Sequence, residues 1–394
     1  MKTTVPPAGR GTSTILALAA ISAMGSMAIH MLVPALPAMA HDLSVGQTQA
    51  QLAISIYLGG LGCGQLLAGP AADRMGRRPV LLAGLVLYIL GAAGSALAGG
   101  LAELLGARLI QALGGAAGVV TARVMVSDIF GREESARRQA TLMMIVLVSP
   151  ALSPVVGGLL AGFGGWRTIP AVLGVIALGA MAIALTRLPE TRRARESQPD
   201  TGPLWHDLGR LLRNRQFLLP TLTLAGGSSA LYMFLSSAAF LLVRSFGLNE
   251  KQTGPFFLVV ALASIVGTRL VGPVTRRFDG LVAGTSFILT GSLIELGLAL
   301  TGASGPVILI APMLLVGLGA GILGPSAISI VIFAESGLAG TATSLAGAGQ
   351  MIASGLATSL LAHFAPIDLL RLGIALSVSA SIAFTAALIR TNSH

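Results

Sequence analysis

Charged residues leave unusually long stretches of this 394-residue chain empty. Between Arg10 and Asp42 lie 31 uncharged positions, and between Asp42 and Asp73 lie another 30. A helix needs only about 20 apolar residues to cross a hydrocarbon core of ~30 Å. Only 10% of the residues are charged and 54% are hydrophobic, whereas a typical soluble domain carries about 25% charged residues. The pattern excludes a soluble globular fold and predicts a polytopic membrane protein.

The apolar runs, divided at charges, prolines and glycine clusters, predict about twelve membrane-spanning helices. Their ranges are 13–36, 47–69, 79–99, 101–125, 139–161, 168–188, 217–241, 253–273, 281–301, 305–331, 338–363 and 368–390. One long polar connection, 191–215, separates an N-terminal half, 1–190, from a C-terminal half, 216–394. Within it, Leu204 to Leu212 is predicted to form a short amphipathic helix on the membrane surface. This fold class is all-α, with six helices in each half.

The positions of the cations predict the orientation of the chain. With twelve spans both termini share one side, and that side carries 18 of the 25 Lys and Arg residues, against four on the other. Because cations near span ends resist translocation, we expect both termini and the linker in the cytoplasm. The net charge of +10 then reflects topology, so no nucleic-acid partner is expected. The motif Ala38-Met39-Ala40 imitates a signal-peptidase site, but the apolar run before it is longer than a signal peptide's, and we interpret it as a retained first span.

Cysteine and histidine usage argues against a metal or redox site. The only cysteine, Cys63, lies in an apolar segment, and the five histidines are scattered. We therefore expect no metal and no cofactor.

Three short motifs carry a resemblance to a known family. Residues 69–79 read GPAADRMGRRP, which fits the signature G-x-x-x-D-R-x-G-R-R; residues 108–114 read RLIQALG, and 149–158 read SPALSPVVGG. In these features, and through nearly its whole length, the chain resembles the major facilitator superfamily and, within it, the Bcr/CflA-type drug:proton antiporters. The resemblance implies two six-helix halves around a central cavity, and export of small molecules in exchange for protons.

The resemblance assigns a conformational latch to the first motif, formed by Gly69, Asp73, Arg77 and Asp128. It implies that Asp73 faces the start of the helix near Gly340 in the outward-facing state, and that Arg77 pairs with Asp128. A carboxylate is favoured at the positive end of a helix. The alternative is that the arginines of this loop only fix topology.

The other two motifs lie inside predicted spans. Arg108 is placed about 10 Å into its span, where a charge is costly unless it faces a partner or a wet cavity. The resemblance gives it a role in proton exchange, and a structural hydrogen-bonding role is the alternative. Pro150, Pro154, Gly157 and Gly158 form the antiporter motif, in which proline bends the helix and glycine permits close contact. Ordinary proline kinks are the alternative here.

The first span departs from the family pattern. Its element Pro34-Ala35-Leu36-Pro37 is preceded, four residues earlier, by His30 where the family typically has an acidic residue. An imidazole can exchange protons near neutral pH, so His30 is a candidate for proton coupling, with a neutral hydrogen-bonded histidine as the alternative. Glu295, deep in the ninth span, is a third candidate, or else a protonated group in a helix contact.

Polar side chains at helical spacing predict the lining of a cavity: Ser26, Tyr57, Gln111, Tyr232, Ser236, Gln350 and Ser354. Because no carboxylate joins them, we expect small amphipathic substrates that are neutral, zwitterionic or weakly anionic. The predicted function is proton-coupled efflux across a bacterial inner membrane by a monomer, with the substrate, protons and the lipid bilayer as partners. A proton-coupled importer of nutrients is one alternative. A membrane-embedded sensor or enzyme is another, although no nucleophile-base pair supports catalysis.

Overall fold

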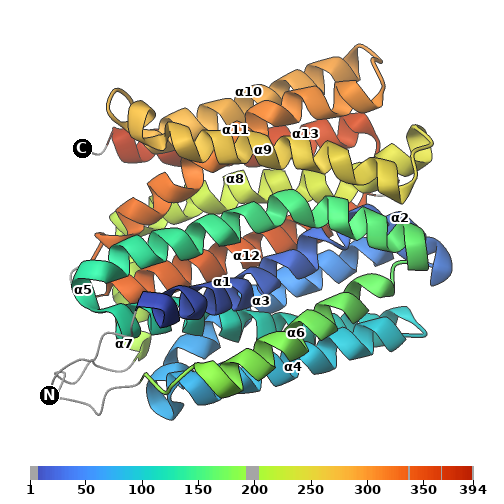
Figure 1. Cartoon of the computed structure of the whole chain (residues 1–394). Helices are drawn as coiled ribbons and strands as arrows, with labels where there is room; N and C mark the ends of the chain where they lie inside the picture. Colours follow the sequence, from blue (N-terminus) through green and yellow to red (C-terminus); the bar gives the residue numbers. More distant parts are fainter. Residues whose placement is uncertain (1–7, 192–203, 336–337, 365, 393–394) are drawn as a thin grey trace, which may run out of the picture.

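A computed structural model describes residues 8–191, 204–335, 338–364 and 366–392, and within these ranges the fold is helical, without strands. The elements are α1 (Ala8–His30), η1 (Val33–Ala35), α2 (Leu36–Asp42), α3 (Gln47–Met75), α4 (Arg77–Leu97), α5 (Leu101–Gly164), α6 (Thr168–Arg187), α7 (Leu204–Arg213), α8 (Arg215–Phe240), η2 (Leu241–Ser245), α9 (Glu250–Thr275), α10 (Gly280–Leu300), α11 (Pro306–Ile332), α12 (Ala339–His363) and α13 (Leu369–Thr391). The start of α1 and the end of α13 lie at the same end of the bundle, on the left of Figure 1.

The predicted spans are present as helices. In the described residues, 11 helices are long and apolar enough to cross a membrane, and a shorter apolar helix covers Val148–Gly164. The first span differs in detail, because α1 ends at His30 and the chain continues through η1 and α2 to Asp42. Pro34 and Pro37 explain the break, since neither can donate the backbone hydrogen bond that an uninterrupted helix requires.

The fourth and fifth spans belong to one helical element, α5, where the sequence predicted a loop over 126–138. Arg108 and Gly157 nevertheless both contact the stretch from Ala28 to Met31. A straight helix would hold them roughly 70 Å apart, so α5 reverses its direction between them. The connecting residues are rich in Glu, Arg, Gln and Ala, which are good helix formers, and the turn therefore stays helical.

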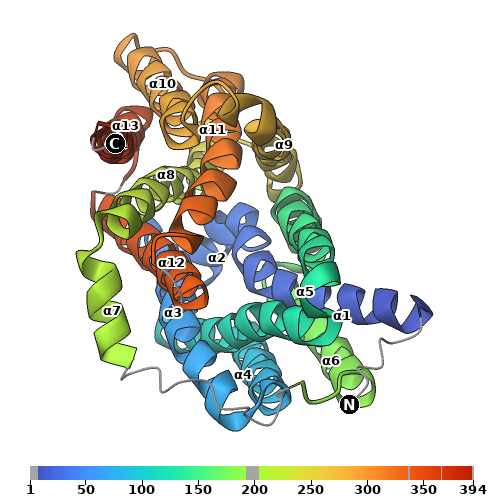
Figure 2. The same ribbon diagram turned by 90° about the vertical axis from the view of Figure 1, so that its left-hand side faces the viewer.

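The helices pack as two groups, seen along the bundle in Figure 2. Helices α1 and α3–α6 contact one another, and α8–α13 form a second group. Contacts between the groups run chiefly through α3 with α12 and α5 with α9, and through η1 and α2 against α8.

The two groups meet closely at the end of the bundle opposite the start of α1, which we call the sealed end. There Thr48 Oγ1 donates to the carbonyl of Ala362 at 2.7 Å. Towards the other end, the contact between α3 and α12 continues to Gln65 and Gly347. Beyond that point the side chain of Asp73, in the last turns of α3, is 72% exposed. The structure thus joins the halves by polar contacts at the sealed end, and the last turns of α3 carry an exposed Asp73 at the opposite end.

The linker contains the predicted short helix, observed as α7. Its Leu211 is fully buried in a small apolar cluster with Phe217, Val331 and Leu338, and Arg210 forms an ion pair with Glu335. The helix therefore docks on the C-terminal group, and its position relative to the membrane surface stays a prediction. The linker residues 192–203 lie outside the described part of the chain.

Candidate functional site

Arg108 occupies the centre of the polar contacts between α1, α3 and α5. Its side chain is 2% exposed. Nη2 donates to the carbonyl of Ala28 in α1 at 2.9 Å, and Nε points to the carbonyl of Ala53 in α3 at 3.4 Å. Nη1 donates to Oε1 of Gln111, one turn along α5, at 3.0 Å. The guanidinium thus joins three helices by donating only to neutral acceptors.

The charge of Arg108 is balanced by an aromatic face. The guanidinium carbon lies 4.2 Å from the ring centroid of Tyr57 in α3, which is cation–π geometry. Among the described residues no carboxylate forms an ion pair with Arg108. The Tyr57 hydroxyl and the Gln111 amide nitrogen are both buried without a hydrogen-bond partner. A buried cation beside two unused polar groups is a site prepared for a ligand or for a change of conformation.

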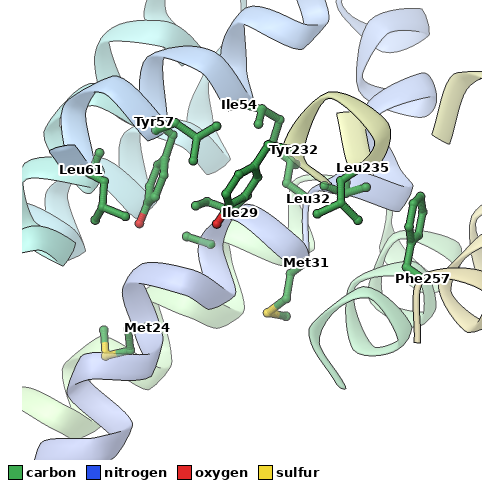
Figure 3. Close-up of a cluster of buried hydrophobic side chains, with 14 of the residues drawn as sticks. Met24, Ile29, Met31, Leu32, Ile54, Tyr57, Leu61, Tyr232, Leu235 and Phe257 are labelled. Carbon is green, nitrogen blue, oxygen red and sulfur yellow. The ribbon is translucent and has the colours of Figure 1, made fainter. Parts of the chain in front are cut away.

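His30 ends α1 at the boundary between the two groups of helices. Its Nδ1 lies 2.9 Å from the carbonyl oxygen of Ser26, and because a carbonyl only accepts, Nδ1 carries a hydrogen. The imidazole centroid is 6.1 Å from the ring of Tyr232 in α8. In Figure 3 the rings of Tyr57 and Tyr232, which come from different halves, direct their hydroxyls to the same side. The His30 ring therefore lies against residues of both halves, Ser26 in α1 and Tyr232 in α8.

The pocket that Arg108 lines between α1, α4, α5 and α6 is small. Its volume is about 10 Å³, and Leu32, Ser95 and Trp166 contribute to its wall. This is the space of about one water molecule, whereas a drug-sized ligand needs about 300–1,000 Å³. A transported compound therefore does not bind in this pocket.

The remaining predicted lining residues already have hydrogen-bond partners within the protein. Gln350 Nε2 donates to Ser228 Oγ at 2.7 Å, which joins α12 to α8. The hydroxyls of Ser354 and Ser236 donate to carbonyls of their own helices, at 2.8 and 3.1 Å. Such bonds are the usual arrangement of serine within a helix.

A polar contact at the sealed end was missed by the sequence analysis. Gln51 Nε2, fully buried in α3, donates to the carbonyl of Ser236 at 3.1 Å and reaches Ser237 Oγ at 3.3 Å. Together with Thr48 it ties the N-terminal half to α8 and α12. The signal was present as Gln47, Gln51 and Ser55 at spacing four, which marks one face of a helix.

The glycines of the antiporter motif lie in the contacts that close the sealed end. A side chain at Gly157 would overlap the Met31 backbone, and one at Gly158 would overlap the Glu250 carbonyl of α9. One turn further along α5, Lys251 Nζ lies 4.1 Å from the ring centroid of Phe163. Pro150 and Pro154 are inside α5, and the carbonyl of Pro154 faces Gly254 of α9. At this motif α5 and α9 thus pack backbone to backbone, without side chains between them.

The charged residues of the first motif form a cluster at the opposite end. Arg77 Nε lies 3.2 Å from Asp128 Oδ2, and Arg77 Nη1 lies 3.0 Å from Asp73 Oδ1. Thr191 Oγ1 donates to the same Asp128 oxygen at 3.0 Å. The ion pair of Arg77 with Asp128 is as expected, and Asp73 turns to Arg77 rather than to the start of α12.

The two glycines of this motif differ. Gly76 separates α3 from α4 with φ of +103°, a backbone conformation that favours glycine. The Glu190 carboxylate accepts hydrogen bonds from the backbone nitrogens of Arg77 and Arg78, at 3.0 and 3.1 Å, and so caps α4. Gly69 is inside α3, since the helix continues to Met75, and a side chain there would meet open space. The sequence had placed Gly69 in a loop.

Glu295 lies away from these residues. It is 1% exposed in α10, and its Oε2 has no hydrogen-bond partner. Helix α10 packs with α11, α13, α8 and α9, all in the C-terminal group. The structure therefore does not bring Glu295 together with His30 and Arg108.

Comparison with known proteins identifies the family. The sequence matches the Major Facilitator Superfamily over residues 16–358. It is 32% identical to the "Chloramphenicol resistance protein" of Pseudomonas aeruginosa over 78% of this chain and 73% of that protein. It is 31% identical to "Multidrug resistance protein D" of Escherichia coli (strain K12) over 89% of each.

Solved structures agree on the fold. A bacterial homologue of the human lysosomal transporter Spinster, in an inward-facing and unoccupied conformation, superposes with a TM-score of 0.74 at 17% identity, covering 97% of this chain and 98% of that one. A D-xylose–proton symporter gives 0.73 at 16% identity, covering 95% and 96%. With its helical bundle, its motifs and these relatives, the chain belongs to the major facilitator superfamily, among the Bcr/CflA-type drug:proton antiporters.

Proposed function

We propose that the protein exports small amphipathic drugs or metabolites in exchange for protons, as a monomeric carrier with both termini in the cytoplasm of a bacterial cell. The resistance proteins to which it is similar support this activity. In this orientation the sealed end faces outward. The two halves would rock about the central contacts, so that α3 meets α12 at the cytoplasmic end when the sealed end opens.

The observation that carries the substrate class is the buried Arg108 without an acidic partner. Helices α1, α3, α5, α8, α9 and α12 meet between the halves, and their described acidic side chains lie near the ends of the spans. A cationic drug would therefore find Arg108 and His30 instead of a counter-ion, and like charges in a poorly solvated site repel. Neutral, zwitterionic and weakly anionic compounds are therefore favoured.

The proton site proposed here is His30. Its Nδ1 hydrogen is held by the Ser26 carbonyl, so an incoming proton would bind at Nε2. Protonation adds a second cation close to Arg108, whose guanidinium reaches the Ala28 carbonyl two residues before His30 in the chain. Repulsion between the two charges supplies a reason for the halves to reorganise when the proton arrives.

A susceptibility panel in an efflux-deficient host tests this function. Expression should raise the inhibitory concentration of chloramphenicol, a neutral compound, and leave that of quaternary ammonium compounds unchanged. The matched variant His30→Asn retains a donor for the Ser26 carbonyl but cannot take up a proton. In proteoliposomes this variant should bind the drug and release no proton. Resistance confined to quaternary ammonium compounds, or full proton release from His30→Asn, would contradict the proposal.

A further inference from the structure

A groove of about 370 Å³ lies on the outer surface of the C-terminal half, between α8 and α13. Its walls are Leu219 and Leu222 of α8 and Ile382, Thr385 and Ile389 of α13. Both helices belong to one half, so the groove is separate from the interface at which the halves meet. Leu222 and Ile382 are 50% and 57% exposed, which in a membrane means exposure to lipid.

The shape of the groove follows from one tight crossing. A side chain at Gly226 would come within 3.0 Å of Ala383, and Ser379 Oγ donates to the Gly226 carbonyl at 2.8 Å. Small residues allow helices to approach closely at this point. One turn and more towards the start of α8, Pro220 interrupts the helical hydrogen bonds. Ser381, Thr385 and Ala386 of α13 are small, and they leave space between the two helices at this groove.

The charge at the mouth of the groove identifies the occupant. Arg215 is the first residue of α8 and precedes Leu219 and Leu222 by four and seven positions, so all three lie on one stripe of the helix. Arg215 is exposed, and it forms no ion pair within the described part of the chain. Arg390, the neighbouring cation on α13, is already neutralised by Asp279 at 2.8 Å. The free cation thus stands about 6–10 Å along the helix from the apolar walls, which is the spacing of a lipid phosphate from its first acyl carbons.

The hydroxyls of the groove strengthen this match. Thr221 and Thr223 in α8 bond to carbonyls of their own helix at 2.7 Å. Ser381 and Thr385 line the groove, and neither hydroxyl forms a hydrogen bond with another described residue. They are available to the ester oxygens of a glycerolipid.

We propose that this groove is a binding site for one anionic phospholipid, with an acyl chain against Leu222 and Ile382 and the phosphate at Arg215. Basic sites between transmembrane helices on the cytoplasmic side are suited to anionic head groups. The site does not depend on the transported substrate, so its failure would leave the proposed export function standing.

Native mass spectrometry of the full chain, purified with equal amounts of phosphatidylglycerol and phosphatidylethanolamine, tests the proposal. The wild type should retain phosphatidylglycerol in preference. Arg215→Gln should weaken that binding about fivefold, the effect of one cation near a membrane surface, and leave phosphatidylethanolamine unchanged. Arg276→Gln, which removes another exposed cation outside the groove, should have no effect. Thr385→Trp should fill the groove and remove the bound lipid, and Ser381→Leu serves if the tryptophan variant does not fold.

Four results would overturn the site. They are equal retention of both lipids by the wild type, the same loss from Arg276→Gln as from Arg215→Gln, full retention by a folded groove-filling variant, and displacement of the lipid by a transported drug. A doubled mass that disappears in Thr385→Trp would instead identify the groove as a contact between two copies of the chain. Thermal unfolding in the same detergent verifies that each variant is folded.

Discussion

At the scale of single residues, Arg108 combines a buried charge with neutral partners only. A guanidinium presents five donors in a rigid fork, and here the fork reaches carbonyls of two helices and an amide oxygen of its own helix. Lysine cannot reproduce this arrangement because its ammonium is a single, strongly hydrated point. The role of Arg108 therefore depends on its geometry as well as on its charge.

We predict that Arg108→Ala and Arg108→Lys both abolish drug resistance. The alanine variant leaves the Ala28 carbonyl and Gln111 without their donor, at about 1–3 kcal/mol for each unsatisfied buried group. Inhibitory concentrations in the efflux-deficient host measure the loss, with immunoblots for protein level. Arg276→Ala is the matched control, since it removes an exposed arginine at the end of α9, away from the Arg108 site. Wild-type resistance in Arg108→Lys would show that charge alone suffices.

Glu295 provides the opposite case, a buried ionisable group outside the interface of the halves. Glu295→Gln preserves its shape and hydrogen-bonding capacity, so resistance should stay within about twofold of the wild type. Because a neutral amide replaces a carboxyl group that lacks one partner, thermal stability should be equal or slightly higher. Loss of drug-driven proton release in a stable Glu295→Gln protein would instead establish a second proton site in the C-terminal half.

At the scale of elements, the second part of α5 acts through the absence of side chains. Gly157 and Gly158 bring this helix against backbone atoms of Met31 and Glu250. Gly179 in α6, by contrast, has open space where a side chain would begin. A side chain should therefore disturb packing at Gly157 or Gly158, and it should be tolerated at Gly179.

Gly157→Leu should prevent closure of the sealed end and abolish resistance, whereas Gly179→Leu should retain it. Overpacking of this kind typically costs 1–3 kcal/mol. Here it destabilises only the conformation in which the sealed end is closed. The two variants can be compared by inhibitory concentration and by the accessibility of a cysteine introduced at Thr48 to a membrane-impermeant thiol reagent. Equal resistance in the two variants would show that the antiporter motif is not part of the surface that closes the sealed end.

The connection within α5 shows where element boundaries resist prediction. Charge and polarity marked 126–138 as a loop, and the chain does reverse its direction after Arg108 and before Gly157. Its residues are nevertheless helix formers, and helix extends into the reversal from both sides without a long loop. Polarity predicts which part of a membrane protein leaves the bilayer, and it carries little information about backbone conformation there.

At the scale of the whole molecule, the observed conformation joins the two halves by polar contacts at the sealed end. We predict that joining positions 48 and 362 with a short bifunctional thiol reagent, in a chain with Thr48→Cys, Ala362→Cys and Cys63→Ser, arrests transport. A reducible reagent should allow transport to recover after reduction. Asp73→Asn removes the carboxylate that we propose faces the start of α12 in the opposite state, and it should raise the yield of cross-linking. Transport by the fully cross-linked protein would show that this end does not open.

Much of the molecule was predictable because a membrane restricts the solutions. Backbone groups in lipid must be satisfied within helices, so apolar length alone located the spans. Arg108 and His30 were identifiable because ionisable groups are rare at that depth. The partner of Gln51 could not be identified from the sequence. Its acceptor is the Ser236 backbone carbonyl, and every residue type presents such a carbonyl. The docking of α7 through Leu211 was not predictable either, because the apolar cluster around Leu211 forms only in the folded protein.

The contacts at the sealed end have a consequence for how the sequence can diverge. Thr48 and Gln51 donate to main-chain oxygens of Ala362 and Ser236, which any residue at those positions would also present. Selection therefore acts on the donor side only, and the acceptor positions can drift while the gate persists. Pairwise co-variation among homologues should be weak across this gate, although it is where the two halves are most firmly joined.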